Sequence, residues 1–169
     1  MSRLRIQLFG TVRVILEGEP VTGFESDKAR ALLAYLAVEA DRPHQREKLA
    51  GMLWPESTEQ VARAYLRRLL VNVRRVIGDY EAESPPLHIT RQTIQFNGGS
   101  DAWIDVTAFT ALLEAPGATI RQLEEAVALY RGDFLEGFSI ADSAAFEEWA
   151  LLKREQLGRQ VVAALHRLA

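Results

Sequence analysis

The sequence predicts an α+β fold in which short antiparallel strands precede helices and a β-hairpin, and a helical segment follows. Three observations predict it. Apolar residues alternate with period two at the start of the chain, recur at helical spacing over most of the rest, and alternate again near residue 90. The chain has 169 residues, 48% of them hydrophobic and 25% charged, which suits one compact domain or two small ones.

The first 25 residues predict a small antiparallel sheet. Apolar and polar side chains alternate over residues 3–16 around Gly10, so we expect two short strands joined by a tight turn. Gly18 and Pro20 mark a second turn, and a third strand is expected to begin near Val21.

Helical spacing then predicts three helices, which cover residues 27–40, 45–54 and 58–77. Ser26 is the expected N-cap of the first helix. Ser57 and Gln60 have the spacing of a capping box, which predicts the start of the third helix. Gly78 is placed to end that helix in a left-handed conformation.

A hairpin follows, in which apolar residues on one face flank the turn Thr90–Thr93; these residues are Leu87, Ile89, Ile94 and Phe96. We place a domain boundary after it, at the glycine-rich stretch 97–100. The predicted domains are residues 1–99 and 100–169. In the second domain we expect only helices, at residues 105–115, 119–131 and 142–168, and no stop signal ends the last one, which suggests a chain cut from a longer polypeptide.

Charge is distributed unevenly although the net charge is only −3. Residues 1–97 carry 14 Lys and Arg against 12 Asp and Glu, whereas residues 98–169 carry 6 against 11. The third predicted helix contains no acid between Gln60 and Gly78 but has five arginines, namely Arg63, Arg67, Arg68, Arg74 and Arg75. A helical projection places them on one arc, opposite an apolar stripe centred on Leu66. Such a face is a candidate footprint for phosphate, and the alternative is a solvated surface.

The order of helix, turn, helix, basic helix and hairpin is typical of a winged helix-turn-helix, in which the last helix enters the major groove of DNA. The hairpin would be the wing. Its tip carries Thr90, Arg91 and Gln92, whose donors suit contacts to the backbone or the minor groove. The alternative for the tip is a plain polar turn.

Four sequence motifs together resemble the SARP family of antibiotic-regulatory-protein-like activators, over the whole chain. The motifs are ARALLAYL at 29–36, REKL at 46–49 with LWP at 53–55, ARAYLRRL at 62–69, and YRGDFLEGF at 130–138. The first part resembles the OmpR/PhoB-type winged helix, and the second resembles the bacterial transcriptional activator domain. The resemblance implies a DNA-binding winged helix joined to a tetratricopeptide-like helical domain. One departure is Gln45, a poor N-cap where the family often has Ser.

The resemblance implies a sequence-specific transcriptional activator as the function. Its partners would be double-stranded DNA with a direct-repeat operator and RNA polymerase, and the acidic helical domain would mediate self-association or contact other regulator domains. The polymerase contact implied for the loop between the second and third helices comprises Pro55, Glu56, Ser57, Thr58 and Glu59. Arg46 is a candidate phosphate contact. Tyr65 lies beside the core stripe, where packing and phosphate contact are both open.

Several other function classes find little support. The chain has no Cys, and its histidines, His44, His88 and His166, have no helical partner, so we expect no metal site. The acid pairs Glu124–Glu125 and Asp101/Asp105 lack a neighbouring nucleophile and are expected at the surface, so we predict no enzyme and no cofactor. No stretch is long enough for a membrane span, and we expect a cytoplasmic protein. The alternative function is a protein-interaction scaffold of the same fold that does not bind DNA.

Overall fold

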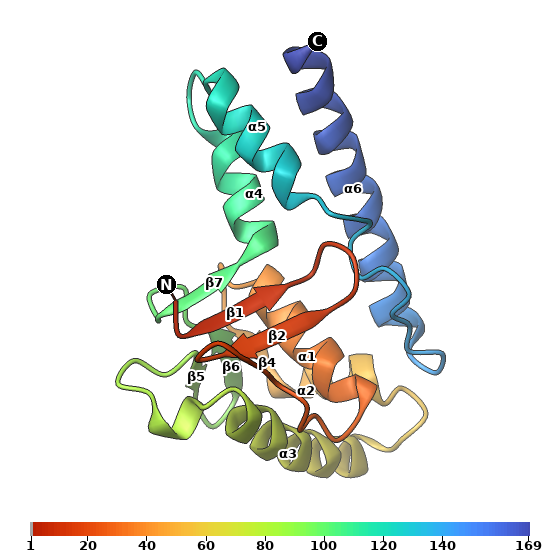
Figure 1. Ribbon diagram of the computed structural model, residues 1–169. Coiled ribbons are helices and arrows are strands. Elements are labelled where there is room, and N and C mark those ends of the chain that lie inside the picture. The colour runs from red at the N-terminus through yellow and green to blue at the C-terminus, as the bar shows by residue number, and fades with distance from the viewer. Residues whose placement is uncertain (1) are drawn as a thin grey trace.

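The structure is a computed structural model that describes residues 2–169, and it confirms the predicted α+β fold (Figure 1). The strands are β1 (Leu4–Gln7), β2 (Arg13–Leu16), β3 (Glu19–Pro20), β4 (His44–Gln45), β5 (Leu87–Ile89), β6 (Thr93–Phe96) and β7 (Ala102–Ile104). The helices are α1 (Asp27–Val38), α2 (Arg46–Leu53), α3 (Glu59–Val76), α4 (Asp105–Glu114), α5 (Ile120–Leu129) and α6 (Ala144–Leu168), with a short 3₁₀ helix at Asp79–Glu81.

The N-terminal sheet has the strand order β3-β2-β1-β7. β1 and β2 pair antiparallel, with Leu4 opposite Leu16, as the alternation predicted. The third strand lies at Glu19–Pro20, slightly before the predicted position. The prediction that only helices follow residue 100 was wrong, because β7 pairs in parallel with β1 and places Ile104 opposite Ile6.

The three helices of the first part begin and end close to the predicted residues. Ser26 caps α1, and its Oγ accepts a hydrogen bond from the Ala29 amide at 3.3 Å. The predicted capping box of α3 was wrong, because the N-cap is Thr58, whose Oγ1 accepts from the Val61 amide at 3.3 Å. Ser57 instead belongs to the preceding turn, where its amide donates to the Trp54 carbonyl oxygen.

Two further features of the helix ends agree with the sequence. Gly78 follows α3 with a φ of 70°, the left-handed conformation expected there. Gln45 precedes α2 and makes no side-chain capping bond. The start of α2 is held instead by strand pairing of β4 with β6, in which Gln45 lies opposite Thr93.

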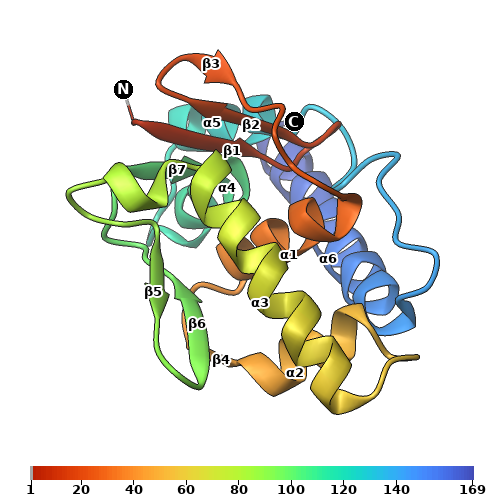
Figure 2. The same ribbon diagram turned by 90° about the horizontal axis from the view of Figure 1, so that it is seen from below.

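The second sheet, in the order β4-β6-β5, holds the predicted hairpin beside α3. Viewed from below, α3 crosses the near face of the molecule, with β5 and β6 on one side and α2 near its N-terminal end (Figure 2). The helices α4 and α5 lie on the opposite side of the N-terminal sheet from α3, and α6 runs past the sheet so that its first turns lie beside α1 and α2 (Figure 1). The face of α3 is therefore free of the helical segment.

The two predicted domains share one hydrophobic core. Phe9 and Phe134, both fully buried, meet in an isolated β-bridge, and the Leu135 amide donates to the Leu8 carbonyl oxygen at 2.8 Å. The expectation that Asp105 lies at the surface was wrong: it is 2% exposed, and its carboxylate accepts hydrogen bonds from the amides of Leu8, Phe9 and Val106. The segment after residue 100 is therefore attached to the N-terminal sheet by strand pairing, packing and a buried carboxylate.

The end of α2 also contacts the start of α6. The Ser143 hydroxyl donates to the Met52 carbonyl oxygen, and Lys28 on α1 pairs with Asp142 at 3.0 Å. A positive φ of 73° at Gly137 helps to turn the chain into this region. The helical segment therefore lies against the helix-turn-helix at α1 and α2, close to the turn that precedes α3.

Candidate nucleic-acid interface

Four of the five predicted arginines lie exposed along α3: Arg63, Arg67, Arg68 and Arg75. Their helix is fixed from the other side by buried residues that include Leu66 and Val73. Within residues 2–169, none of these four guanidinium groups has a carboxylate oxygen within 4.0 Å. Their like charges are thus not compensated by ion pairs, and an anionic partner would relieve the repulsion.

Arg74 differs from the other four because it has partners inside the protein. Its Nε donates to Asp79 Oδ2 at 2.7 Å, and its guanidinium carbon lies 4.1 Å from the centre of the Tyr80 ring. The Asp79 side chain is fully buried, and Oδ1 accepts from the Leu87 amide at 2.9 Å. Arg74 therefore ties the end of α3 to the first strand of the wing.

The wing tip is closed by a threonine. Thr90 Oγ1 accepts hydrogen bonds from the amides of Gln92 and Thr93, at 3.2 and 2.9 Å. This leaves the side chains of Arg91 and Gln92 exposed at the turn. The three predicted wing residues thus separate into one that shapes the turn and two that are available to a ligand.

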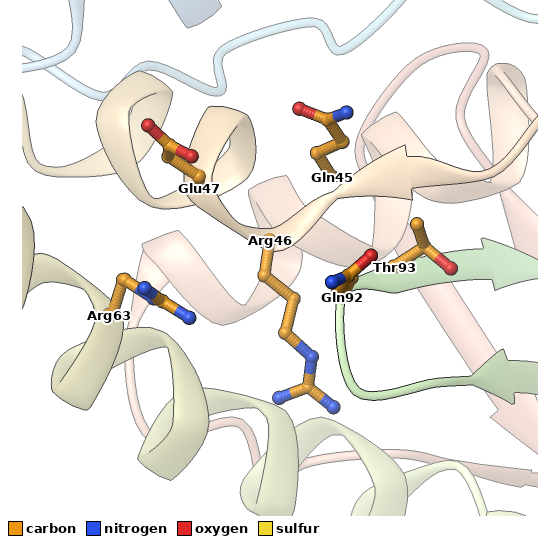
Figure 3. Close-up of a pocket in the computed structure, with 6 residues that line it drawn as sticks. All are labelled: Gln45, Arg46, Glu47, Arg63, Gln92 and Thr93. Atoms are coloured by element: carbon orange, nitrogen blue, oxygen red, sulfur yellow. The ribbon is translucent and has the colours of Figure 1, made fainter.

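Arg46 lies between the wing and α3, and its guanidinium is directed into the space between them (Figure 3). Arg46, Arg63, Leu66, Arg67 and Arg91 line a cleft of about 320 Å³ there. An adjoining cleft of about 350 Å³ is lined by Gln45, Arg46, Glu47, Arg63, Gln92 and Thr93. Burial lowers the pKa of Arg46, and the positive charges of Arg67, Arg63 and Arg74 lower it further. The structure thus brings together predicted residues from α2, α3 and the wing in a strongly positive region.

Two carboxylates lie near this region without neutralising it. Glu47 lines the adjoining cleft, and Glu59 lines a shallow one beside Arg63 and Arg67. Both are exposed, and neither forms an ion pair with a described arginine. Glu59 stands in the first turn of α3, where the helix dipole favours a negative charge.

The turn between α2 and α3 contains two acids and no base, and its last residue, Glu59, borders the cleft beside Arg63 and Arg67. Pro55, Glu56, Thr58 and Glu59 are exposed, while Ser57 is half-buried. Tyr65 packs on Trp54 at a centroid distance of 5.6 Å and is 39% exposed. The Lys28 ammonium group lies over the Trp54 ring of this pair, 5.3 Å from the ring centre. The turn is therefore supported by an aromatic pair and by the Lys28–Asp142 contact to the helical segment.

Sequence reasoning missed one residue that positions α3. Asn72 is 3% exposed; its Oδ1 accepts from the Glu25 amide and its Nδ2 donates to the Gly23 carbonyl oxygen, both at 3.0 Å. The loop before α1 is thereby fixed against α3. Asn72 lies at the edge of the apolar stripe in a helical projection, so residue type and spacing did not mark it as buried; its burial depends on the partners at Gly23 and Glu25 that the fold supplies.

Two negative findings concern residues 2–169. No group of three or more His, Asp or Glu side chains in this range is arranged to hold a metal ion. None of the helices described is both long enough and apolar enough to pass through a membrane.

The fold and the arginine-covered third helix define a winged helix-turn-helix protein with an attached helical segment. No protein-family model matches the chain. Its fold is similar to that of Mycobacterium tuberculosis EmbR, solved in complex with a low affinity phosphopeptide, with a TM-score of 0.76 over 99% of this chain and 45% of that one. The two are 24% identical in this comparison, so the likeness concerns the fold.

The sequence is also similar to the transcriptional regulatory protein EmbR of Mycobacterium bovis and of Mycobacterium tuberculosis. In each case 33% of residues are identical over 77 residues, which is 46% of this chain. The matched segment spans about 20% of the length of these proteins. They are transcriptional regulatory proteins by name, and no enzyme is among them.

Proposed function

We propose that the chain is the DNA-binding part of a transcriptional activator of the SARP type. In this proposal α3 enters the major groove, and the wing touches the adjacent backbone or minor groove. The similarity to EmbR supports a regulator of transcription. A protein with this function would work in the cytoplasm, where bacterial DNA is located.

One observation carries the proposal: exposed arginines without ion pairs line the face of α3 that the rest of the fold leaves free, and the wing stands beside it. Guanidinium groups bind phosphate and also read guanine edges through two parallel hydrogen bonds. A surface helix with no such partner would gain from acids placed one turn away from its arginines, and α3 has none beyond its first residue.

The arginines of α3 are proposed to have different roles. Arg63 and Arg67 stand one turn apart near the N-terminal end, which usually reaches deepest into the groove, so we assign them to base edges. Arg68 and Arg75 lie together toward the far edge of the arc and are assigned to phosphates. Arg74 is assigned to holding the wing, because its guanidinium is already paired with buried Asp79.

The remaining surfaces are assigned by their position. The exposed turn Pro55–Glu59 is proposed to contact RNA polymerase, and its acids make it a poor phosphate ligand. The helices α4 to α6 are proposed to mediate contacts between two copies of the chain. Two copies side by side in the same direction would read a direct-repeat operator.

Selection of bound sequences from a random duplex pool, at fixed salt, tests the proposal. We expect enrichment of a motif, in one or two directly repeated copies. The selected duplex should then bind the double variant Arg63→Ala/Arg67→Ala at least about tenfold more weakly than the wild type, since each arginine–guanine pair contributes about 1–3 kcal/mol.

Arg13→Ala provides the control, because it removes one positive charge from an exposed position on β2, outside α3, the wing and the helices α4 to α6. It should bind the selected duplex as the wild type does. If the wild type enriches no motif and shows no salt-dependent binding to duplex DNA, the proposal is wrong. A protein-interaction scaffold would then be the better description of this fold.

A further inference from the structure

Arg46 makes contacts that a simple phosphate ligand would not need. Its Nε and Nη2 both donate to the Thr90 carbonyl oxygen, at 3.2 and 2.9 Å. Its own amide donates to the Gln92 carbonyl oxygen at 2.8 Å. The first residue of α2 therefore holds both ends of the wing tip, through its side chain and its main chain.

The same side chain faces α3. Arg46 lines one cleft together with Arg63, Arg67 and Arg91, which come from the helix and from the wing tip. No carboxylate lines this cleft. Because like charges repel, the four guanidinium groups would separate if the wing were free, and the two hydrogen bonds to Thr90 oppose that separation.

A single tetrahedral anion suits such a cleft. A phosphodiester oxygen accepts charge-assisted hydrogen bonds from guanidinium groups, often in pairs, and it would reduce the repulsion among the arginines. The cleft is lined by residues of the proposed recognition helix and of the wing tip, where the backbone of a duplex bound by both elements would pass.

We propose that Arg46 is a positioning residue, which holds the wing tip at a fixed separation from α3 so that Arg91 binds a backbone phosphate while Arg63 and Arg67 reach the base edges. This rests on the proposed function. Arg46 acts through the wing, and the binding energy of Arg91 depends on it. If Arg46 instead contacted phosphate directly and independently, the contribution of Arg91 to binding would not depend on Arg46.

The first test uses the protein without DNA. Arg46→Lys keeps the positive charge but lacks the planar fork that places two donors on one carbonyl oxygen. Amide hydrogen exchange of the segment 88–95 should become at least about threefold faster in this variant, because the wing opens more often. Arg75→Lys on the exposed face of α3 is the matched control and should leave that exchange unchanged. Unchanged exchange in Arg46→Lys would refute the restraint on the wing.

The second test is a double-mutant cycle on the selected duplex. Arg91→Ala should weaken binding about fivefold in the wild type and less than about twofold in the Arg46→Lys background, because the wing is then no longer in place. Additive losses would refute the positioning role. Arg46→Gln, which keeps one side-chain donor and removes the charge, should show the same coupling, and it replaces Arg46→Lys if that variant does not fold.

The two proposals fail in different ways. If the wild type does not bind duplex DNA, the proposed function is wrong. If the wild type binds and the losses at Arg46 and Arg91 add, only the role assigned to Arg46 is wrong.

Discussion

Replacing Asp105 by Ala should destabilise the whole chain, although this residue lies far from the arginine face. The carboxylate is 2% exposed and accepts hydrogen bonds from the amides of Leu8 and Phe9, in the segment after β1, and from Val106 in α4. An alanine side chain accepts none of them. The three N–H groups would lose their partner at the junction between the N-terminal sheet and the helical segment.

The expected loss follows from the number of orphaned donors. A buried polar group without a partner costs about 1–3 kcal/mol, so three of them, with some access of water to the smaller side chain, correspond to a loss of about 3–5 kcal/mol. That is a large part of the about 5–15 kcal/mol by which a domain is usually stable. Urea unfolding followed by far-UV circular dichroism measures it as a lower midpoint at an unchanged slope.

Asp101→Ala is the control for this substitution. Asp101 carries the same charge, lies four residues earlier and is exposed, so its loss should change the free energy of unfolding by less than about 0.5 kcal/mol. A loss below about 1 kcal/mol for Asp105→Ala would refute the reasoning, because it would mean that these amides find other partners.

Three further predictions concern pH, the arginines and the turn. Burial raises the pKa of Asp105 despite its N–H partners, so the folded chain binds this proton more tightly than the unfolded chain does. The resulting gain in folding stability is complete below the pKa of Asp in the unfolded chain, about 3.9, and is lost as the pH rises through the pKa of the folded state. The stability difference between the wild type and Asp105→Asn should therefore be larger near pH 4 than at pH 7; equal differences would contradict the direction of the shift. Arg67→Ala should relax specificity at one base position. Arg75→Ala should weaken binding to specific and random duplexes alike and reduce the slope of affinity against salt concentration by about one unit, as titrations at several salt concentrations can measure. If neither variant loses more than about threefold in affinity, the arginine face is only a solvated surface. Glu56→Ala should lower transcription in a reconstituted assay while DNA binding stays intact; weaker DNA binding with full activation per bound complex would argue against the polymerase contact. Thr58→Ala should instead lower the free energy of unfolding by about 1 kcal/mol, because Thr58 caps α3.

The sequence predicted the elements whose signals are local. Alternation around the turn at Thr90 indicated the wing, and Gly78 marked the end of α3, because a left-handed residue there is a property of the local backbone. The arc of arginines on α3 was likewise readable, since helical periodicity alone determines which side chains share a face.

Features that depend on distant parts of the chain were not readable. β7 has three residues, too few to show a period, and it is a strand only because β1 offers an open edge. Asp105 looked like a surface acid because its partners lie about 97 residues earlier in the chain. The wing contact of Arg46 and the ion pair of Arg74 also needed the folded arrangement, because the type and spacing of these residues indicate only positive charge.

The pairing of β7 with β1 also affects the order in which the fold can be completed. β1 lies between β2 and β7, so during synthesis one edge of it stays open until residue 104 has left the ribosome. An open edge can pair with strands of other chains. A shortened chain that ends at residue 99, at the boundary suggested by the glycine-rich stretch, would keep that edge open permanently and would also lose the Phe134 contact with Phe9. The smallest piece that can be prepared without aggregation is therefore expected to extend well into the helical segment.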